Sequence, residues 1–555
     1  MKRRYSELAG RRNRLALALI VAAALLAIVV QPGALGAPER QRGGIFRISL
    51  AVQAGLDHMD PALSFTAPGW ALIDTTCARL MAYPDKAPPA GFRLAPEVAA
   101  RFPKTSPDFK TFTFTLRTGF RFSDGKPVRA SAFARAINRT LVPSIKSPGA
   151  MFTRDIRGAA AVLAGKRRAA SGVDARGNTL VVRFTRPAPD FPALTTLPFF
   201  CAVPPTLPDP EGLGPFPTAG PYHVVEYRLG ERVVLRRNRF YGGRRPHHVD
   251  GFDVDLKAPS PREMIQRIER GEADWGHNIA PAFLDPALGL QEKYGINRSQ
   301  FFLKPGLTLS MFAFNTSRLL FRNNPKLRRA LNFALDRRAL QAIGGGPLTG
   351  RLTDQYVPPI VPGFRDATIY PLRRSNLQRA RTLARGNLRG GTAVLYTADF
   401  PAPLAVAQLA KQQLAEIGLH VDIKAFPVHI ATAAYLSQLA ATTEPWDLAL
   451  VLWGPNLPDP RAYINLLLDG QNVGGTNFAH FSSNRFNREM RRAARLPRVR
   501  ERQRAYGVLD IRVAREAAPF AAVRVLSEPT LVSKRVASRC IVLRPQLNLT
   551  GVCLK

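Results

Sequence analysis

Acidic side chains are scarce in this chain of 555 residues, with 40 Asp and Glu against 79 Lys and Arg and a formal net charge of +39. A basic excess of this size is typical of nucleic-acid-binding proteins, and also of a generally basic surface beside an anionic cell envelope. The arginines follow no consistent helix-face spacing, have no aromatic residues interleaved with them and recur along the whole chain. We therefore favour a generally basic surface and expect no nucleic-acid partner.

Cysteine is also rare, with four residues that form no C-x-x-C motif, so zinc and thioredoxin-like sites are not indicated. An even count in an exported chain allows two disulfides. Cys540 and Cys553 are close in sequence near the C-terminus and form the first pair that we expect. Cys77 would then pair with Cys201 by elimination. Four buried free thiols explain the same count equally well.

The motifs of common enzyme classes are missing, with no G-x-S-x-G, no H-E-x-x-H, no Walker loop and no G-x-G-x-x-G after a strand. The eight histidines are scattered along the chain. His247 and His248 lie in a basic loop, where solvated side chains are the ordinary state. His420, His429 and His480 form no metal-ligand set by their spacing. We expect no catalytic residues, no cofactor and no metal site.

The N-terminal region has the pattern of an export signal. Residues 1–14 carry six basic residues and one acidic residue, and residues 15–30 are an uninterrupted apolar run of 16. Ala34-Leu35-Gly36 then fits the small-x-small pattern of a cleavage site. The sequence therefore predicts a signal peptide over residues 1–37 and a protein that works outside the cytoplasm. An uncleaved membrane anchor is the alternative, although such a helix would be about 24 Å long, shorter than a hydrocarbon core of about 30 Å.

The remaining chain is too long for a single hydrophobic core, so we expect two or three lobes. Residues 111–117 alternate between apolar and polar side chains, which indicates a strand with one solvated face. Residues 392–396, a helix from about Pro403, and residues 421–426 form a strand–helix–strand series. Such a series predicts a parallel pair of strands with a right-handed crossover, as in α/β proteins.

Residues 446–468 contain the arrangement that best suggests a binding site. Residues 448–453 are an unbroken apolar run of strand length, typical of a strand buried on both faces. Prolines at 455, 458 and 460 end the run because proline supplies no ladder donor, and residues 461–468 resume with helical spacing. Irregular backbone at the carboxyl end of a strand is where ligands bind in open α/β sheets. An ordinary strand-to-helix loop explains the same pattern.

A series of short motifs resembles the family 5 solute-binding proteins of ABC importers, the group of oligopeptide, dipeptide and nickel binders. The resemblance covers essentially the whole exported chain. Each motif is weak alone, and the resemblance depends on their order and spacing. In chain order the motifs lie at residues 43–44, 56–61, 94–99, 113–117, 122–125, 220–222, 237–238, 271–275, 327–337, 447 and 453–460.

The resemblance implies a two-lobed α/β architecture, the type II periplasmic-binding-protein fold, with an extra α/β domain in the first lobe. Segments near residues 303–308 and 520–526 would form the hinge about which the lobes close on a ligand. The expected parts are lobe I (residues 44–80, 200–305 and 525–555), the extra domain (81–199) and lobe II (306–524).

The resemblance also implies ligand contacts in the turn after residue 453, where backbone following a tryptophan and the carboxylate of an aspartate meet the ligand. The aspartate position is occupied here by Asn456, so the expected ligand-binding residues are Leu452, Trp453, Gly454 and Asn456. Asparagine forms hydrogen bonds but carries no charge to attract a peptide ammonium group. Blocked peptides, modified amino acids and sugars therefore fit as well as free peptides. Asp459 is expected to cap the following helix.

The function implied by the resemblance is capture of a peptide or similar polar solute outside the cytoplasm. A monomeric protein without enzymatic activity would deliver that solute to a membrane permease and its ATPase. The alternative from another functional class is a membrane-tethered interaction or signalling module that keeps the same fold. Nickel or metal-chelate binding, known elsewhere in the family, is a further alternative.

Overall fold

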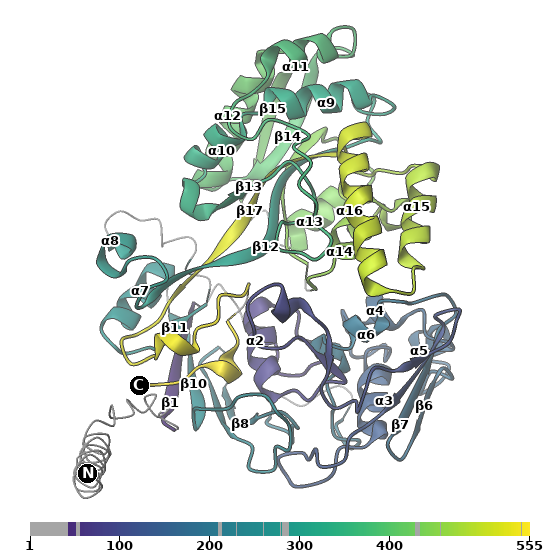
Figure 1. Cartoon of the computed structure of the whole chain (residues 1–555), viewed down its shortest axis with the longest axis vertical. Helices are drawn as coiled ribbons and strands as arrows, with labels where there is room; N and C mark the ends of the chain where they lie inside the picture. Colours follow the sequence, from purple (N-terminus) through teal and green to yellow (C-terminus); the bar gives the residue numbers. More distant parts are fainter. Residues whose placement is uncertain are drawn as a thin grey trace, which may run out of the picture.

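The computed structural model describes residues 43–555 apart from 52–55, 209–213, 229, 259, 278, 280–287, 428–432, 456 and 546. The expected signal segment, residues 1–37, lies outside the described residues. None of the described helices is long and apolar enough to cross a membrane. Three larger sheets, each with its own helices, make up most of the molecule (Figure 1).

The first sheet has five strands and gathers segments from both ends of the chain's first half. In spatial order they are β11 (Trp275–Gly276), β1 (Ile45–Ala51), β10 (Gly251–Ala258), β9 (Arg232–Arg237) and β8 (Tyr222–Arg228). β1 runs parallel to β10 and β11, whereas β9 is antiparallel to its two neighbours. Phe46 and Phe252 share a buried core with residues of α2 (Ala67–Thr76). Helices α7 (Pro261–Glu269) and α8 (Leu290–Tyr294) cover a second, smaller cluster.

The second sheet has six strands and lies at the opposite end of the molecule (Figure 1). In spatial order they are β13 (Gly350–Leu352), β17 (Phe520–Leu531), β12 (Phe301–Phe314), β16 (Leu448–Trp453), β14 (Thr392–Ala398) and β15 (His420–Phe426). β14 and β15 are parallel and are joined through α12 (Pro401–Ala415), which confirms the predicted strand–helix–strand unit. The other helices are α9 (Pro325–Ala334), α10 (Arg337–Ile343), α11 (Leu377–Ala384), α13 (Ala433–Ala440), α14 (Arg461–Leu468), α15 (Asn484–Ala494) and α16 (Val499–Glu516).

The third sheet has four strands and packs beside the first. In spatial order they are β4 (Lys104–Thr105), β5 (Thr111–Thr115), β7 (Thr179–Arg183) and β6 (Val173–Arg176). Phe112 and Phe114 are buried while the threonines of β5 are not, as the alternation of the sequence predicted. The remaining elements are β2 (Met81–Ala82), β3 (Ala95–Pro96), α3 (Ala130–Arg139), α4 (Ala150–Thr153), α5 (Ala159–Leu163) and α6 (Phe191–Leu194).

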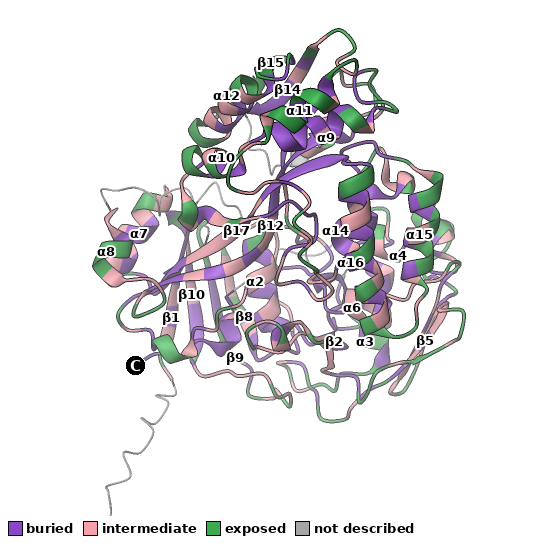
Figure 2. Ribbon diagram, turned by 45° about the horizontal axis from the view of Figure 1, so that its top comes forward, coloured by how far each residue is buried: buried purple, intermediate pink, exposed green. Residues whose placement is uncertain are grey.

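Strands β12 and β17 form a long antiparallel ribbon that runs from the second sheet to the first (Figures 1 and 2). Pairing extends from Ala313 opposite Phe520 to Phe301 opposite Leu531, and Val532 then bridges to β11 of the first sheet. Between these ends the register slips, because residues 306–308 lie opposite Leu526 alone. An inserted stretch of this kind bends and twists a strand locally. The segments expected to act as a hinge, near 303–308 and 520–526, therefore lie in one ribbon, next to each other at the irregular stretch.

Both cysteine pairs are joined. Cys77, at the end of α2, is bonded to Cys201 with the two Cα atoms 5.3 Å apart, and Cys540 is bonded to Cys553 at 5.8 Å. The structure describes no free cysteine. Both bonds match the pairs expected for an exported chain. The alternative of four free thiols does not match the structure.

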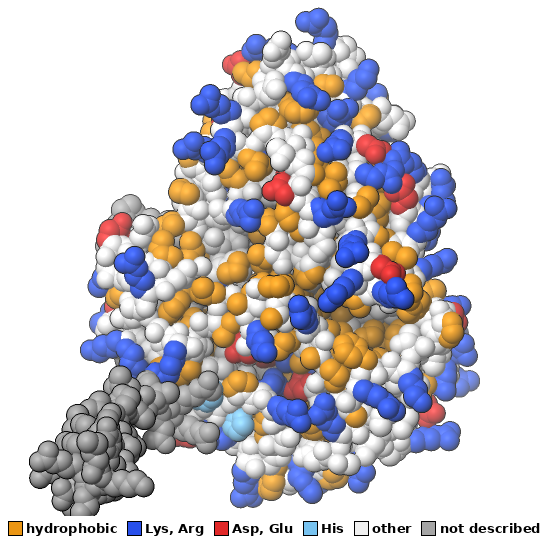
Figure 3. All heavy atoms as spheres, viewed as in Figure 1, with side chains coloured by type: hydrophobic (Ala, Val, Ile, Leu, Met, Phe, Trp, Pro, Cys, Tyr) orange, Lys and Arg blue, Asp and Glu red, His pale blue; other side chains and the backbone are white. Residues whose placement is uncertain are grey.

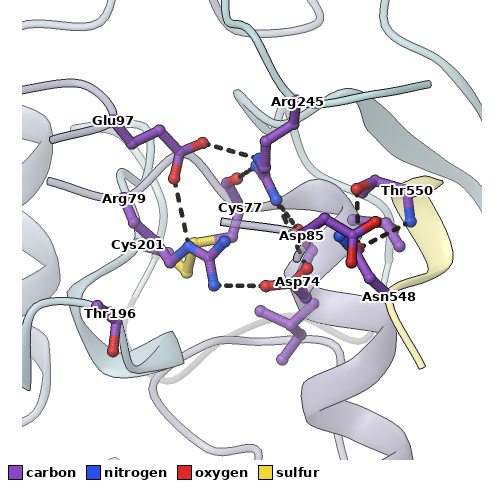
Figure 4. A network of polar contacts seen from close by, with 12 residues as sticks. Asp74, Cys77, Arg79, Asp85, Glu97, Thr196, Cys201, Arg245, Asn548 and Thr550 are labelled. Atoms are coloured by element: carbon purple, nitrogen blue, oxygen red, sulfur yellow. Dashed lines mark hydrogen bonds and ion pairs between the residues drawn. A yellow bond between two sulfur atoms is a disulfide. The ribbon is translucent and has the colours of Figure 1, made fainter. Parts of the chain in front are cut away.

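Ion pairs surround the Cys77–Cys201 bond and fix the end of α2 (Figure 4). Glu97 pairs with Nε of Arg79 at 3.3 Å and with Nε of Arg245 at 2.8 Å, and both arginines also pair with Asp74. Burial alone would raise the pKa of Asp74, but the two guanidinium charges bring it below its ordinary value. Arg245 further donates to the backbone carbonyl of Cys77. This network ties the end of α2 to the segment after β3, which holds Glu97, and to the loop between β9 and β10, which holds Arg245.

Basic side chains are dispersed over the surface. In Figure 3 Lys and Arg cover the visible face from one end to the other, with few Asp and Glu and with hydrophobic side chains between them. Many of the acids are already engaged, as Asp253 is with Arg232 at 2.6 Å and Glu269 with Lys293 at 2.7 Å. This distribution fits the generally basic surface that we inferred from the sequence.

We predict that the Cys540–Cys553 bond forms in the exported protein and stabilises its C-terminal segment. Replacing both residues by serine should lower the free energy of unfolding by about 3 kcal/mol, because the cross-link restricts the unfolded chain. Peptide mapping without reductant, combined with urea unfolding, measures both effects. Alkylatable thiols at these two positions in exported protein would contradict the prediction.

Candidate ligand-binding site

The strand that leads into the expected binding turn lies inside the second sheet. β16 pairs antiparallel with β12, with Leu448 opposite Phe314 and Trp453 opposite Leu309, and it pairs parallel with β14. Its first four residues are buried, whereas Leu452 and Trp453 are half-buried. The strand therefore leaves the core at the position where the sequence predicted a change to irregular backbone.

The indole of Trp453 is held by contacts to α14 and to Phe478, which follows α14 in the chain. Its Nε1 donates a hydrogen bond to the carbonyl of Ala462 at 3.0 Å, and its ring packs edge-to-face on Phe478 with centroids 5.9 Å apart. The side chain thus ties the end of β16 to the first turn of α14. Gly454, which follows, is exposed. Trp453 is in this respect a positioning residue, and the accessible group is the backbone after it.

The turn approaches β12 closely at Gly454. A Cβ atom at this residue would lie 2.8 Å from Oγ1 of Thr308, so a larger side chain would displace one of the two segments. Thr308 belongs to the irregular part of the ribbon described above. The expected ligand contacts at 452–454 and the expected hinge therefore lie next to each other. Asn456, the remaining expected contact, lies outside the described residues.

Asp459 forms a hydrogen bond at the start of α14. Its Oδ1 accepts a hydrogen bond from the backbone N–H of Arg461 at 2.9 Å, which satisfies one of the free donors at a helix N-terminus. Burial raises the pKa of Asp459 above its ordinary value. Pro460 is the N-cap residue of α14 and forms no side-chain capping bond, so Asp459 supports the start of the helix from the position before the cap.

The same turn also contacts the part of the molecule built on the third sheet. The guanidinium of Arg461 forms an ion pair with the carboxylate of Asp190, which precedes α6. Burial alone would lower the pKa of Arg461, but the Asp190 charge leaves it raised. Leu457 packs against the hydrophobic cluster of the third sheet. The half of the molecule built on the second sheet and the half built on the first and third sheets therefore meet directly beside the expected binding turn.

Histidines and acids do not assemble into a metal centre in the described ranges. No three His, Cys, Asp or Glu side chains converge there. His480 is buried with its Nε2 2.9 Å from the carbonyl of Leu439, and His420 is exposed at the start of β15. His429 lies outside the described residues. His420 and His480 are thus found in unrelated surroundings.

Comparison with known proteins identifies the family. The model of the bacterial extracellular solute-binding proteins, family 5 middle region, matches residues 93–475. The chain belongs to this family. It is 24% identical over 430 residues to the probable D,D-dipeptide-binding periplasmic protein DdpA of Escherichia coli K12, covering 75% of this chain and 76% of the relative. It is 25% identical over 401 residues to the periplasmic oligopeptide-binding protein OppA of Salmonella typhimurium, covering 69% and 70%.

Solved structures show the same fold. The clavulanic acid biosynthesis oligopeptide binding protein 2 superposes with a TM-score of 0.80 at 22% identity, covering 93% of this chain and 96% of that chain. The unliganded open form of MppA, a periplasmic murein tripeptide binding protein, superposes with a TM-score of 0.74 at 19% identity. The type II periplasmic-binding-protein fold predicted from the sequence is confirmed.

Asp190 and Arg461 were not singled out from the sequence. They are 271 positions apart, and neither stands in a recognisable motif. Only the position of α14 against α6 brings them together. A basic residue at the first position of a helix is in fact against the preference of the helix dipole, and this is the one local signal that could have drawn attention to Arg461.

We predict that Asp190 stabilises the contact between the two halves. Asp190→Asn removes the charge that pairs with Arg461 and should weaken solute binding by about 1 kcal/mol, which is roughly fivefold in Kd. Calorimetric titration with the solute that co-purifies with the protein measures the change. Asp155→Asn is the matched control, because Asp155 pairs with Arg186 away from α14. Equal affinity in the Asp190 variant and its control would contradict the prediction.

Proposed function

We propose that this protein is the extracytoplasmic solute-binding component of an ABC importer. It captures a peptide or a similar polar solute and delivers it to a membrane permease and its ATPase. The observation that carries the proposal is the family match over residues 93–475. The relatives described above are named for binding dipeptides and oligopeptides, and this supports the ligand class.

Capture requires two halves that separate and close, and the fold supplies parts suited to this motion. The β12–β17 ribbon, with its slipped register at residues 306–308, is the proposed hinge. Lobe I would comprise the first and third sheets, and lobe II the second sheet. Leu452, Trp453, Gly454 and Asn456 are the proposed ligand contacts. Of these, Leu452, Trp453 and Gly454 lie at the end of β16, near the proposed hinge and the Arg461–Asp190 contact, whereas Asn456 is proposed from the sequence alone.

The protein would act outside the cytoplasmic membrane, as the relatives named periplasmic do. Residues 1–37 are the proposed signal peptide, with a retained anchor as the other outcome. The protein would work as a monomer and would release its solute chemically unchanged, because its task is binding and transfer.

Native mass spectrometry of the exported protein, purified gently from its own host, tests the proposal. We predict that the protein retains a peptide or another small polar solute. Trp453→Ala should lose that solute, because the turn is no longer tied to α14 and Phe478, while circular dichroism remains that of a folded protein. Trp453→Phe keeps the ring contact and is the matched control, with retention between the two. A protein that is empty and also shows no thermal shift with a broad solute panel would favour the tethered interaction module instead.

A further inference from the structure

Two oppositely charged side chains face each other in the ribbon that joins the two sheets. Lys304 of β12 lies directly opposite Glu528 of β17 in the antiparallel register. Side chains at directly opposed positions project from the same face of a strand pair. A Cβ atom added at Gly306 would lie 3.4 Å from Cγ of Glu528, so the Glu528 side chain extends along the face that positions 304 and 306 share.

The two charges act on each other, but neither makes a close polar contact within the described part of the chain. The Lys304 side chain is only 3% exposed, yet within the described part of the chain no hydrogen bond or ion pair reaches its ammonium group. The same holds for the carboxylate of Glu528, which is partly buried. Burial lowers the pKa of Lys304 and raises the pKa of Glu528, although each charge partly opposes the effect on the other. Lysine and glutamate are rarely buried in this way unless they are paired.

Two other buried charged side chains of the described residues show how such groups are usually satisfied. Arg337 is completely buried and donates hydrogen bonds to the carbonyls of Ala522 and Asn332 and to the Asn332 side chain. Asp274 is completely buried and accepts from the Ser533 hydroxyl at 2.7 Å and from Arg535 at 3.0 Å. Lys304 and Glu528 differ from these two residues, because no comparable contact reaches their charged groups in the described part of the chain. An unpaired buried charge is costly, so a partner from outside the chain explains why both are present.

The pair lies between the first sheet and the expected binding turn. Phe302, two residues before Lys304 on the same strand face, packs into the core of the first sheet. In the other direction the strand reaches Thr308, which lies against Gly454. A solute that touches the backbone after Trp453 and extends along β12 therefore meets Lys304 and Glu528 next.

Two further titratable groups interact electrostatically with Lys304. Burial and the Lys304 charge lower the pKa of His277 to about 4, so its ring is neutral at ordinary pH. Arg544 also acts on Lys304, but its own Nη1 is 3.4 Å from Oδ1 of Asp85. Neither group compensates the Lys304 ammonium, and among the described residues Glu528 is the carboxylate that acts on it.

We propose that Lys304 and Glu528 form a charge-recognition subsite for a zwitterionic solute, with Lys304 binding the solute's carboxylate and Glu528 its ammonium group. The inference deepens the proposed function by naming the class of solute, and it rests on that function. Because the two residues are direct neighbours across the ribbon, the solute carries its two charges close together, as free amino acids and very short peptides do. A neutral sugar would leave both protein charges unpaired.

This subsite is tested by measuring which compounds of a probe mixture the protein retains when their charged groups are intact or blocked. The probe is a partial acid hydrolysate of casein, which contains amino acids and short peptides, used untreated, N-acetylated, or methyl-esterified. Full-length exported protein is dialysed against each form, and retained compounds are counted by mass spectrometry. The wild type should retain at least about tenfold more from the untreated form than from either treated form, since a charge-assisted hydrogen bond is lost on treatment.

Variants assign each charge to its residue. Lys304→Gln should no longer distinguish esterified from untreated compounds, and Glu528→Gln should no longer distinguish acetylated ones. Lys257→Gln and Glu231→Gln remove a surface pair whose Nζ and Oε2 atoms are 3.9 Å apart, and they should discriminate like the wild type. The melting temperature of the ligand-free Lys304 and Glu528 variants should be unchanged or higher, because an unpaired buried charge has been removed.

The outcomes separate this inference from the function on which it rests. Equal retention of all three hydrolysates by the wild type, or unchanged discrimination in both variants, would overturn the subsite. Lower melting temperatures in both variants with discrimination intact would show an internal ion pair and overturn it as well. Retention of sugars from a parallel panel, with nothing from the hydrolysates, would overturn the subsite and leave solute binding standing. If the wild type retains no compound from the hydrolysates and no sugar, both the subsite and the proposed function are overturned.

Discussion

The pairing of β12 with β17 is the constraint on which the rest of the molecule depends. These two strands carry the main chain between the first and second sheets, and their hydrogen bonds fix how the sheets face each other. The register slips at residues 306–308, where Gly306 approaches the carbonyl of Leu526 so closely that a Cβ atom would lie 2.0 Å from it. Only glycine fits that approach. The ribbon is thus continuous at both ends and irregular between them, where a bend costs least.

The position of the binding turn follows from the same ribbon. β16 pairs with the opposite edge of β12, so its end at Trp453 is placed beside Leu309 and the turn beyond it beside Thr308. The indole hydrogen bond to Ala462 then sets where α14 begins, and α14 places Arg461 against Asp190. One set of strand pairings therefore fixes the proposed hinge, the proposed ligand contacts and the contact between the halves.

Local sequence patterns predict the elements of this fold well but not the contacts between distant ones. The alternation in β5 and the β14–α12–β15 unit could be read directly, because periodicity reports which face of an element is buried. The order of weak family motifs indicated the fold and the turn after Trp453. Lys304 precedes a proline and a glycine, a pattern typical of a loop, and the long pairing with β17 is what places it in a buried strand. Arg461 and Asp190 likewise meet through tertiary packing alone.

The hydrogen bonds of the ribbon and the side-chain contacts beside the binding turn would respond differently to separation of the two lobes. In the proposed hinge motion the hydrogen bonds of the ribbon would persist in open and closed states, so they would favour neither state. The Arg461–Asp190 ion pair and the Leu457 packing join the proposed lobes and would be lost if the lobes separated. A partly exposed ion pair contributes only about 1 kcal/mol, too little to keep the protein closed without solute. A ligand shifts this balance only by binding the closed state better than the open one. In the proposed subsite, a solute that pairs with Lys304 and Glu528 and also contacts the second sheet would supply this preference for the closed state.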